Sequence, residues 1–264
     1  MNVRRSQRGS HRHFRRFKVA LQHHHAGRLC EAAELYENIL AEHPQHADAM
    51  HYLAVIAHQA GRNEVALELI RRLILFDPEY ADAHNSQGNF LRHEGKLTEA
   101  IAAYRRALAL RPEFASAHYN LGNALKSKGR LREAAAAYRQ AIALRPHYVE
   151  AHNNLGSTLK DTGRPLEAID AYRQAIALRP TYAEAYNNLG NSLIQVGRFC
   201  DAVAAYGQAM KLNPGLIEAE QNFRTALKGG SKRAMPSPQR YAAATGHWGR
   251  RNIMRRQYEH AVAG

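Results

Sequence analysis

Apolar and small residues recur along the chain at the spacing of paired amphipathic helices. In residues 149–182 the inner face of a first helix follows an i, i+3, i+4, i+7 pattern, formed by His152, Leu155, Gly156 and Leu159. Gly163 predicts the end of that helix, because glycine accepts the left-handed conformation of a helix C-terminus. A second helix has small and aromatic inner residues, Ala168, Tyr172 and Ala175. Pro180 predicts its end, so this segment is expected to form a helix–turn–helix unit.

The same unit repeats every 34 residues. Prolines keep this interval at Pro44, Pro78, Pro112, Pro146, Pro180 and Pro214. Glycines keep it at Gly27, Gly61, Gly95, Gly129, Gly163 and Gly197. We therefore predict six helix pairs in residues 13–216, namely 13–46, 47–80, 81–114, 115–148, 149–182 and 183–216. A further helix is expected over 217–228, where Glu220 and Arg224 replace inner residues, as suits a solvent-facing cap.

This pattern resembles the tetratricopeptide repeat (TPR), a 34-residue unit with fixed small and aromatic positions. The resemblance is strongest in the third to sixth units. It weakens in the first two, where Val19–Ala20 and Leu53–Ala54 replace Leu–Gly. The resemblance implies an all-α protein, a right-handed α-solenoid (superhelix) of six TPR units with a C-terminal capping helix. It also implies a concave groove lined by the first helix of each unit.

Asparagines gather at two positions of the predicted first helices. Counting from the start of each unit, they occupy the sixth position at Asn120, Asn154, Asn188 and Asn222. They occupy the ninth position at Asn89, Asn123 and Asn191. At about 100° per residue, both positions point away from the inner face, so we expect them to be exposed. Asparagine is a mediocre helix former, so a row of asparagines on the surface of successive helices needs an explanation.

One reason is recognition of extended polypeptide. A carboxamide both donates and accepts hydrogen bonds, so it can bind a peptide group whatever its side chain. Neighbouring helix pairs are expected to stack about 8–10 Å apart, and an extended peptide rises about 3.3 Å per residue. Asparagines one repeat apart would therefore contact roughly every third residue of a bound peptide. The segments 152–157 and 186–191 resemble the asparagine-bearing helices of O-GlcNAc transferase-like proteins, in which such a ladder meets extended chains. Alternatively, these residues bond neighbouring asparagines and only stabilise the stack.

Charge is concentrated at the two ends. The formal net charge is +14, but residues 1–18 hold seven Arg and Lys without an acid, and residues 229–264 hold seven with only Glu259. Residues 19–228 are left with 23 basic and 22 acidic side chains, so a broad electrostatic field is not their means of binding. We therefore distinguish a basic tail at 1–12 and a basic tail at 229–264. Tail-mediated binding of nucleic acid or acidic partners is the second alternative function.

Catalysis, cofactors and metals are not expected. No phosphate-binding glycine loop or nucleophile motif occurs, and 36 residues after the predicted cap are too few for a sugar-nucleotide-binding domain. The chain is expected to be an adaptor, with a substrate-recruiting module or truncated relative of an O-GlcNAc transferase-like glycosyltransferase as the first alternative. Histidines one repeat apart, such as His118 and His152, lie too far apart to share a metal. Cys30 and Cys200, five repeats apart, are expected to be free thiols in the cytoplasm.

Overall fold

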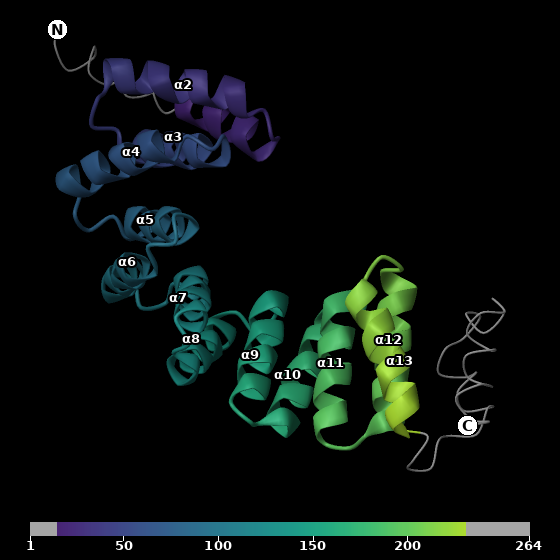
Figure 1. Cartoon of the computed structure of the whole chain (residues 1–264). Coiled ribbons are helices and arrows are strands. Elements are labelled where there is room, and N and C mark those ends of the chain that lie inside the picture. The colour runs from purple at the N-terminus through teal and green to yellow at the C-terminus, as the bar shows by residue number, and fades with distance from the viewer. Residues whose placement is uncertain (1–14, 231–264) are drawn as a thin grey trace, which may run out of the picture. The chain divides into compact units, whose positions relative to one another are not determined.

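The computed structural model describes residues 15–230, and every regular element in that range is a helix (Figure 1). Residues 15–25 are helical. The helices that follow are α2 (Leu29–Glu42), α3 (Ala47–Gln59), α4 (Asn63–Phe76), α5 (Ala81–His93), α6 (Leu97–Leu110), α7 (Ala115–Ser127), α8 (Leu131–Leu144), α9 (Val149–Asp161), α10 (Pro165–Leu178), α11 (Ala183–Gln195), α12 (Phe199–Leu212) and α13 (Ile217–Gly230). None of the described helices is long and apolar enough to cross a membrane. The predicted N-terminal tail and residues 231–264 of the predicted C-terminal tail lie outside the described residues, while 229–230 continue α13 beyond the predicted cap.

The helices form two compact units, one ending at Ala124 and the other beginning at Leu125, so the boundary falls within α7. In the first unit α3 packs on α2 and α4, and α5 packs on α4 and α6. In the second unit each helix from α8 to α13 packs on the next along the chain. First helices of successive pairs also touch, α3 with α5, α9 with α11, and α11 with α13. The predicted all-α solenoid of helix pairs is confirmed.

Small residues and one large side chain fill the core of each pair, an isoleucine (Ile70) in the second pair and a tyrosine in the others. The alanines at the twentieth position are completely buried, as are the tyrosines at the twenty-fourth, Tyr36, Tyr104, Tyr138, Tyr172 and, at 2% exposure, Tyr206. Glycine at the eighth position makes room for this ring. A Cβ added to Gly156 would lie 2.8 Å from Tyr172 Cε1, well inside van der Waals contact. The first and second helices can therefore approach closely only because the eighth residue is small.

The turn within each pair depends on glycine at the fifteenth position. Gly163 has a φ of +75°, in the left-handed region that side chains with a Cβ avoid. Its backbone N–H donates to Lys160 O at 3.1 Å, and the Arg164 N–H donates to Leu159 O at 2.9 Å. These are the two hydrogen bonds of a Schellman motif, which satisfies the last carbonyls of α9. The next helix, α10, starts directly after this turn.

Histidines at the fourth position join one repeat to the next. The Nε2 atoms of His84, His118 and His152 each lie 2.9 Å from the carbonyl oxygen of the proline six residues earlier. A carbonyl only accepts, so Nε2 carries the proton and donates. The proline that ends one helix pair is thus tied to the first helix of the following pair. This contact explains the histidine column without a metal.

Helix α13 has two different faces. Phe223 is buried against α12 together with Ala219, Ala226 and Leu227. Glu220 and Arg224 stand where earlier repeats have inner residues, and they form an ion pair at 2.5 Å. An i, i+4 pair of this kind suits a face turned to solvent.

Candidate functional site

Three of the four sixth-position asparagines donate a hydrogen bond to an asparagine of the preceding repeat. Asn120 Nδ2 donates to Asn85 Oδ1 at 3.1 Å, and Asn188 Nδ2 donates to Asn153 Oδ1 at 3.2 Å. Asn222 Nδ2 donates to Asn187 Oδ1 at 3.1 Å. Each acceptor stands at the fifth position, 35 residues before its donor. We call these donors and acceptors, together with Asn154, the asparagine ladder.

The predicted exposure of the asparagines is only partly correct. All seven candidates, at the sixth and ninth positions, are half-buried. A helical wheel treats a helix as isolated, whereas here the first helix of the preceding repeat covers part of each amide. Two of the three acceptors lie deeper, since Asn153 is 7% exposed and Asn187 is 3% exposed, whereas Asn85 is half-buried. The oxygens of Asn120 and Asn188 accept no hydrogen bond from any residue in 15–230, so each amide keeps an acceptor and one N–H for a guest.

The ninth-position asparagines bind the core tyrosines of their own repeat. Asn89 Oδ1 accepts from the Tyr104 hydroxyl at 2.8 Å, and Asn191 Oδ1 accepts from the Tyr206 hydroxyl at the same distance. Asn191 Oδ1 also accepts from Asn222 Nδ2 at 3.0 Å. Asn123 is half-buried on α7. Two of the three ninth-position amides therefore have a structural role, and their oxygens are already engaged.

The fifth repeat departs from this arrangement. Its ninth position holds Ser157, and Lys126 Nζ donates to the Ser157 hydroxyl at 2.7 Å. Burial lowers the pKa of Lys126, although nearby Asp161 opposes this shift. The Tyr172 hydroxyl, which an asparagine would bind, is buried and has no hydrogen-bond partner among the described residues. A half-buried cation thus stands beside the ladder at the twelfth position of its repeat, which holds Arg92 and Lys160 in the third and fifth repeats.

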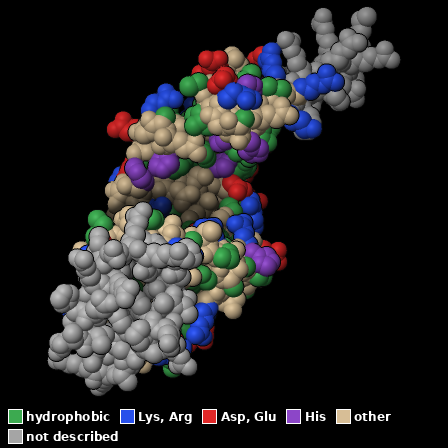
Figure 2. Space-filling model, turned by 90° about the vertical axis from the view of Figure 1, so that its right-hand side faces the viewer, with side chains coloured by type: hydrophobic (Ala, Val, Ile, Leu, Met, Phe, Trp, Pro, Cys, Tyr) green, Lys and Arg blue, Asp and Glu red, His purple; other side chains and the backbone are tan. Residues whose placement is uncertain are grey.

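Two of the five acidic residues at the second position pair with an arginine of their own repeat. Asp82 pairs with Arg111, and Glu150 pairs with Arg179 at 2.5 Å. Burial alone would raise the pKa of Glu150, but its own backbone N–H and the Arg179 guanidinium outweigh burial and hold the pKa below its ordinary value. Each of these arginines also lies over an aromatic ring three residues later, with Arg179 5.2 Å from the Tyr182 ring centre. On the face shown in Figure 2, acidic and basic side chains are interspersed.

In the first unit, residues other than asparagine also make the contact between the fifth position of one repeat and the sixth position of the next. His51 Nε2 lies 2.9 Å from Ser86 Oγ, again 35 residues apart. His51 and Tyr52 belong to a group of rings that includes Phe17, His24 and Tyr36. Burial lowers the pKa of His51, against the opposing effect of Asp82 and Asp48. The first unit therefore has a histidine–serine contact at 51 and 86 and an amide–amide contact at 85 and 120.

Sequence reasoning found the donors of the ladder and missed their partners. The acceptors Asn85, Asn153 and Asn187 were overlooked, as was Lys126. A signal was present, because each acceptor precedes its donor by 35 residues, one repeat plus one. Cys30 and Cys200 are each exposed and free. Within residues 15–230, no three His, Cys, Asp or Glu side chains are placed to hold a metal ion.

Comparison with protein families identifies the fold. The TPR repeat profile matches residues 88–129, 122–163 and 160–197, and two tetratricopeptide repeat profiles match residues 23–89 and 183–216. The chain therefore belongs to the tetratricopeptide repeat family. No protein with a curated description matches the sequence significantly.

Solved structures share the fold at low sequence identity. YrrB, described as a TPR protein with an unusual peptide-binding site, is 22% identical, with a TM-score of 0.63 over 72% of this chain and 97% of YrrB. PilF of Pseudomonas aeruginosa is 19% identical, with a TM-score of 0.71 over 79% of this chain and 95% of PilF. PilW, a type IV pilus biogenesis factor, is 20% identical, with a TM-score of 0.71 over 79% of this chain and 97% of PilW.

Proposed function

We propose that this chain is a non-catalytic scaffold that binds extended segments of other proteins along its first helices, through the asparagine ladder. Membership of the TPR family supports the general role of a protein-interaction module. The similarity to YrrB, a TPR protein with a peptide-binding site, supports it further. Amides held in place before a peptide arrives lower the entropy lost on binding, which favours this use of the ladder.

The observation that carries the proposal is the remaining hydrogen-bonding capacity of Asn188. Its Nδ2 donates one hydrogen bond to Asn153, which fixes the orientation of the side chain. Its oxygen and second N–H take no partner from the described residues, and the side chain is half-buried. A peptide group offers the complementary N–H and C=O. In Asn222 both N–H groups are engaged, so this residue can only accept.

The test uses a random 12-residue peptide library displayed on phage, followed by fluorescence anisotropy with the selected peptides. We expect selected sequences with little side-chain preference in common. We also expect that replacing one central peptide bond by an ester, which removes a backbone N–H, weakens binding. Changing Asn120, Asn154, Asn188 and Asn222 together to Ala should abolish binding of the same peptides.

The matched control changes the acceptors instead. Asn153→Ala and Asn187→Ala remove the inter-repeat hydrogen bonds but keep the groove-facing amides. These variants should lower the free energy of unfolding. They should weaken peptide binding only a few-fold, because the sixth-position amides are then less well oriented. Circular dichroism identifies variants that fail to fold. If folded sixth-position variants bind the peptides as tightly as the wild type, the ladder is structural and the proposal is wrong.

Two alternative functions predict different results in binding experiments. As the recruiting module of an O-GlcNAc transferase-like enzyme, the chain would use the same ladder and would also bind a separately encoded glycosyltransferase. Tail-mediated binding of nucleic acid would instead fall steeply with salt and disappear without residues 1–12 and 229–264. Binding by amides in a segment with nearly balanced charge should change little between low and high salt.

A further inference from the structure

The second unit contains a positively charged hollow that the ladder does not use. Its volume is about 350 Å³, at the small end for ligand pockets. Arg132, Ala135 and Arg139 of α8 line it, with Thr162 at the end of α9 and Arg164 just before α10. These five residues are called the arginine hollow.

The arginines outnumber the acids that neutralise them. Arg164 donates to Glu167 through Nε at 2.5 Å and Nη2 at 2.6 Å, and Arg139 Nη2 lies 3.8 Å from the same carboxylate. Arg132 forms no ion pair or hydrogen bond with any other residue in 15–230. Arg139 and Arg164 thus share one carboxylate and Arg132 has none, so two of the three positive charges lack a counter-charge among the described residues.

Two local features of the sequence create the space and the polarity. The twenty-first position of the second, third, fifth and sixth repeats holds a larger apolar residue, Leu67, Ile101, Ile169 or Val203, whereas the fourth repeat has Ala135 and the first has Ala33. The missing side-chain volume opens the floor of the hollow. Helix α10 begins beside Arg164 without a side-chain cap, so the positive end of its dipole adds to the field that an anion would meet.

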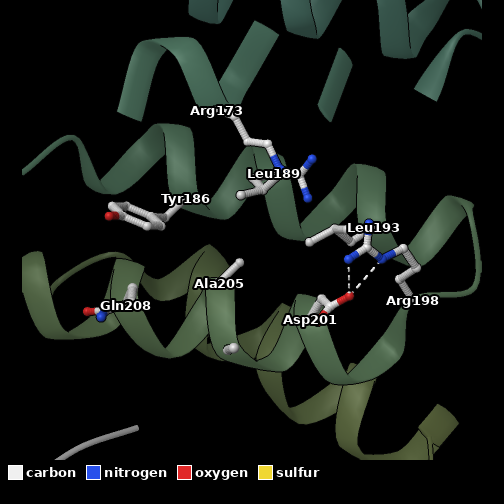
Figure 3. A pocket seen from close by; sticks show the side chains of 9 residues that line it. Arg173, Tyr186, Leu189, Leu193, Arg198, Asp201, Ala205 and Gln208 are labelled. Carbon is white, nitrogen blue, oxygen red and sulfur yellow. Dashed lines mark hydrogen bonds and ion pairs between the residues drawn. The ribbon is translucent and has the colours of Figure 1, made fainter. Parts of the chain in front are cut away.

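The neighbouring repeat supplies an internal comparison. A hollow of about 320 Å³ lies among α10, α11 and α12 (Figure 3). Arg173 and Arg198 correspond to Arg139 and Arg164, but Leu166 stands at the position of Arg132. Arg198 is held by Asp201, with Nε at 2.6 Å, as the dashed lines in Figure 3 mark. The excess charge of this second hollow is smaller, because Arg173 also lies 3.7 Å from Asp170, and Leu189 and Leu193 add apolar lining.

We propose that the arginine hollow binds a phosphate-type oxyanion, with Arg132 and Arg139 as its principal ligands. A phosphoryl group carries about −1.5 to −2 charge at neutral pH, which matches the two uncompensated guanidinium groups. Its oxygens can accept several charge-assisted hydrogen bonds, which the planar guanidinium fork donates well. A ligand with a single carboxylate would neutralise only one of these two positive charges. The source of the phosphate is either the free ion or a phosphorylated side chain.

The test is a calorimetric titration of the full chain with inorganic phosphate, at constant ionic strength and neutral pH. Wild-type protein should show one saturable site. Arg132→Gln should weaken it about tenfold, the typical effect of losing a charged hydrogen bond. Glu167→Gln removes the competing carboxylate and should tighten binding about threefold. This gain could not come from a loss of folding.

The matched control is Arg173→Gln, which makes in the second hollow the change that Arg139→Gln makes in the first. Arg139→Gln should weaken phosphate binding and Arg173→Gln should not, while the basic tails contribute equally to both. Tighter binding of O-phosphoserine peptide than of phosphate would identify a phosphorylated protein as the ligand, and equal binding would identify the free ion. Equal losses in the two variants, or acetate binding as tightly as phosphate, would overturn the proposal.

Discussion

At the scale of single residues, the core tyrosine at the twenty-fourth position has different hydrogen-bonding environments in different repeats. In the sixth repeat the Tyr206 hydroxyl donates to Asn191 at 2.8 Å. In the fifth repeat Ser157 replaces the asparagine and accepts from Lys126, and the buried Tyr172 hydroxyl, although close to Ser157, forms no hydrogen bond of ordinary geometry with any described residue. An unpaired buried hydroxyl costs free energy, whereas a paired one contributes about 1 kcal/mol. The same substitution should therefore have opposite consequences in adjacent repeats.

We expect Tyr206→Phe to lower the free energy of unfolding by about 1 kcal/mol, since it leaves the Asn191 oxygen with one donor fewer. Tyr172→Phe should be neutral or slightly stabilising, because it removes only a hydroxyl that has no partner. Urea denaturation followed by circular dichroism measures both. Equal destabilisation by the two variants would mean that the Tyr172 hydroxyl is paired after all.

The lowered pKa of His51 predicts how the stability of the protein changes at acidic pH. Burial lowers its pKa from the ordinary value of 6.5, and His24 adds to this shift, while Asp82 and Asp48 oppose it. The unfolded chain therefore takes up a proton at a higher pH than the folded chain does. Stability should be constant well above pH 6.5 and should fall as the pH drops through 6.5 toward the folded pKa.

Thermal unfolding at pH 7.5 and pH 5.5 checks this expectation. His51→Gln should reduce the loss of melting temperature between the two pH values, since glutamine does not titrate and can still bond Ser86 Oγ. The composition-matched control is His147→Gln, at an exposed position of the second unit. If both variants keep the wild-type pH dependence, groups other than His51 determine the acid response.

At the scale of helices, the ladder joins first helices that are one repeat apart. The contacts of α9 with α11 and of α11 with α13 carry the pairs Asn153–Asn188 and Asn187–Asn222. The asparagine column itself could be predicted from the sequence, because the position within a helix follows from its period. Its partners do not follow from the helical wheel, because the wheel of one helix contains no information about which neighbour covers it. The 35-residue offset between acceptor and donor is the sequence signal that indicates them.

A double-mutant cycle measures this inter-helix contact. Asn153→Ala and Asn188→Ala should each destabilise the second unit, and their combined effect should be smaller than the sum by about 0.5–1.5 kcal/mol. Asn153 with Asn222 is the control pair, since these residues share no hydrogen bond, and their effects should add. A coupling energy near zero for Asn153 with Asn188 would show that the hydrogen bond does not stabilise the stack.

At the scale of the whole molecule, local rules account for most of the architecture. Glycine and proline define each turn, and each helix packs mainly on its neighbours along the chain, so the 34-residue period suffices to predict the helix pairs. The arginine hollow was not predictable in this way. It depends on Ala135, Arg132 and Arg164 coming together from two successive repeats, and on the distribution of ion pairs around them. Sequence patterns describe the average repeat, whereas sites arise where one repeat departs from it.

Nearest-neighbour packing also predicts how damage at one end spreads. Phe223 of α13 is 1% exposed and packs in the core cluster that contains Tyr206 and Met210 of α12. Phe223→Ala should destabilise this end by about 3–5 kcal/mol, through lost burial and a cavity. Because each repeat contacts only adjacent ones, the loss should decrease with distance from α13.

Hydrogen exchange measured by mass spectrometry tests this gradient. Amides of α11, α12 and α13 should lose protection in the Phe223→Ala variant, those of α9 and α10 should lose less, and those of α3 and α4 should remain as in the wild type. The control, Arg224→Ala, breaks only the exposed pair with Glu220 and should change protection little, because such pairs contribute about 0–1 kcal/mol. Uniform loss of protection from α3 to α13 would instead mean that the repeats unfold as one cooperative body. In that case a partner bound in either unit would stabilise the entire chain.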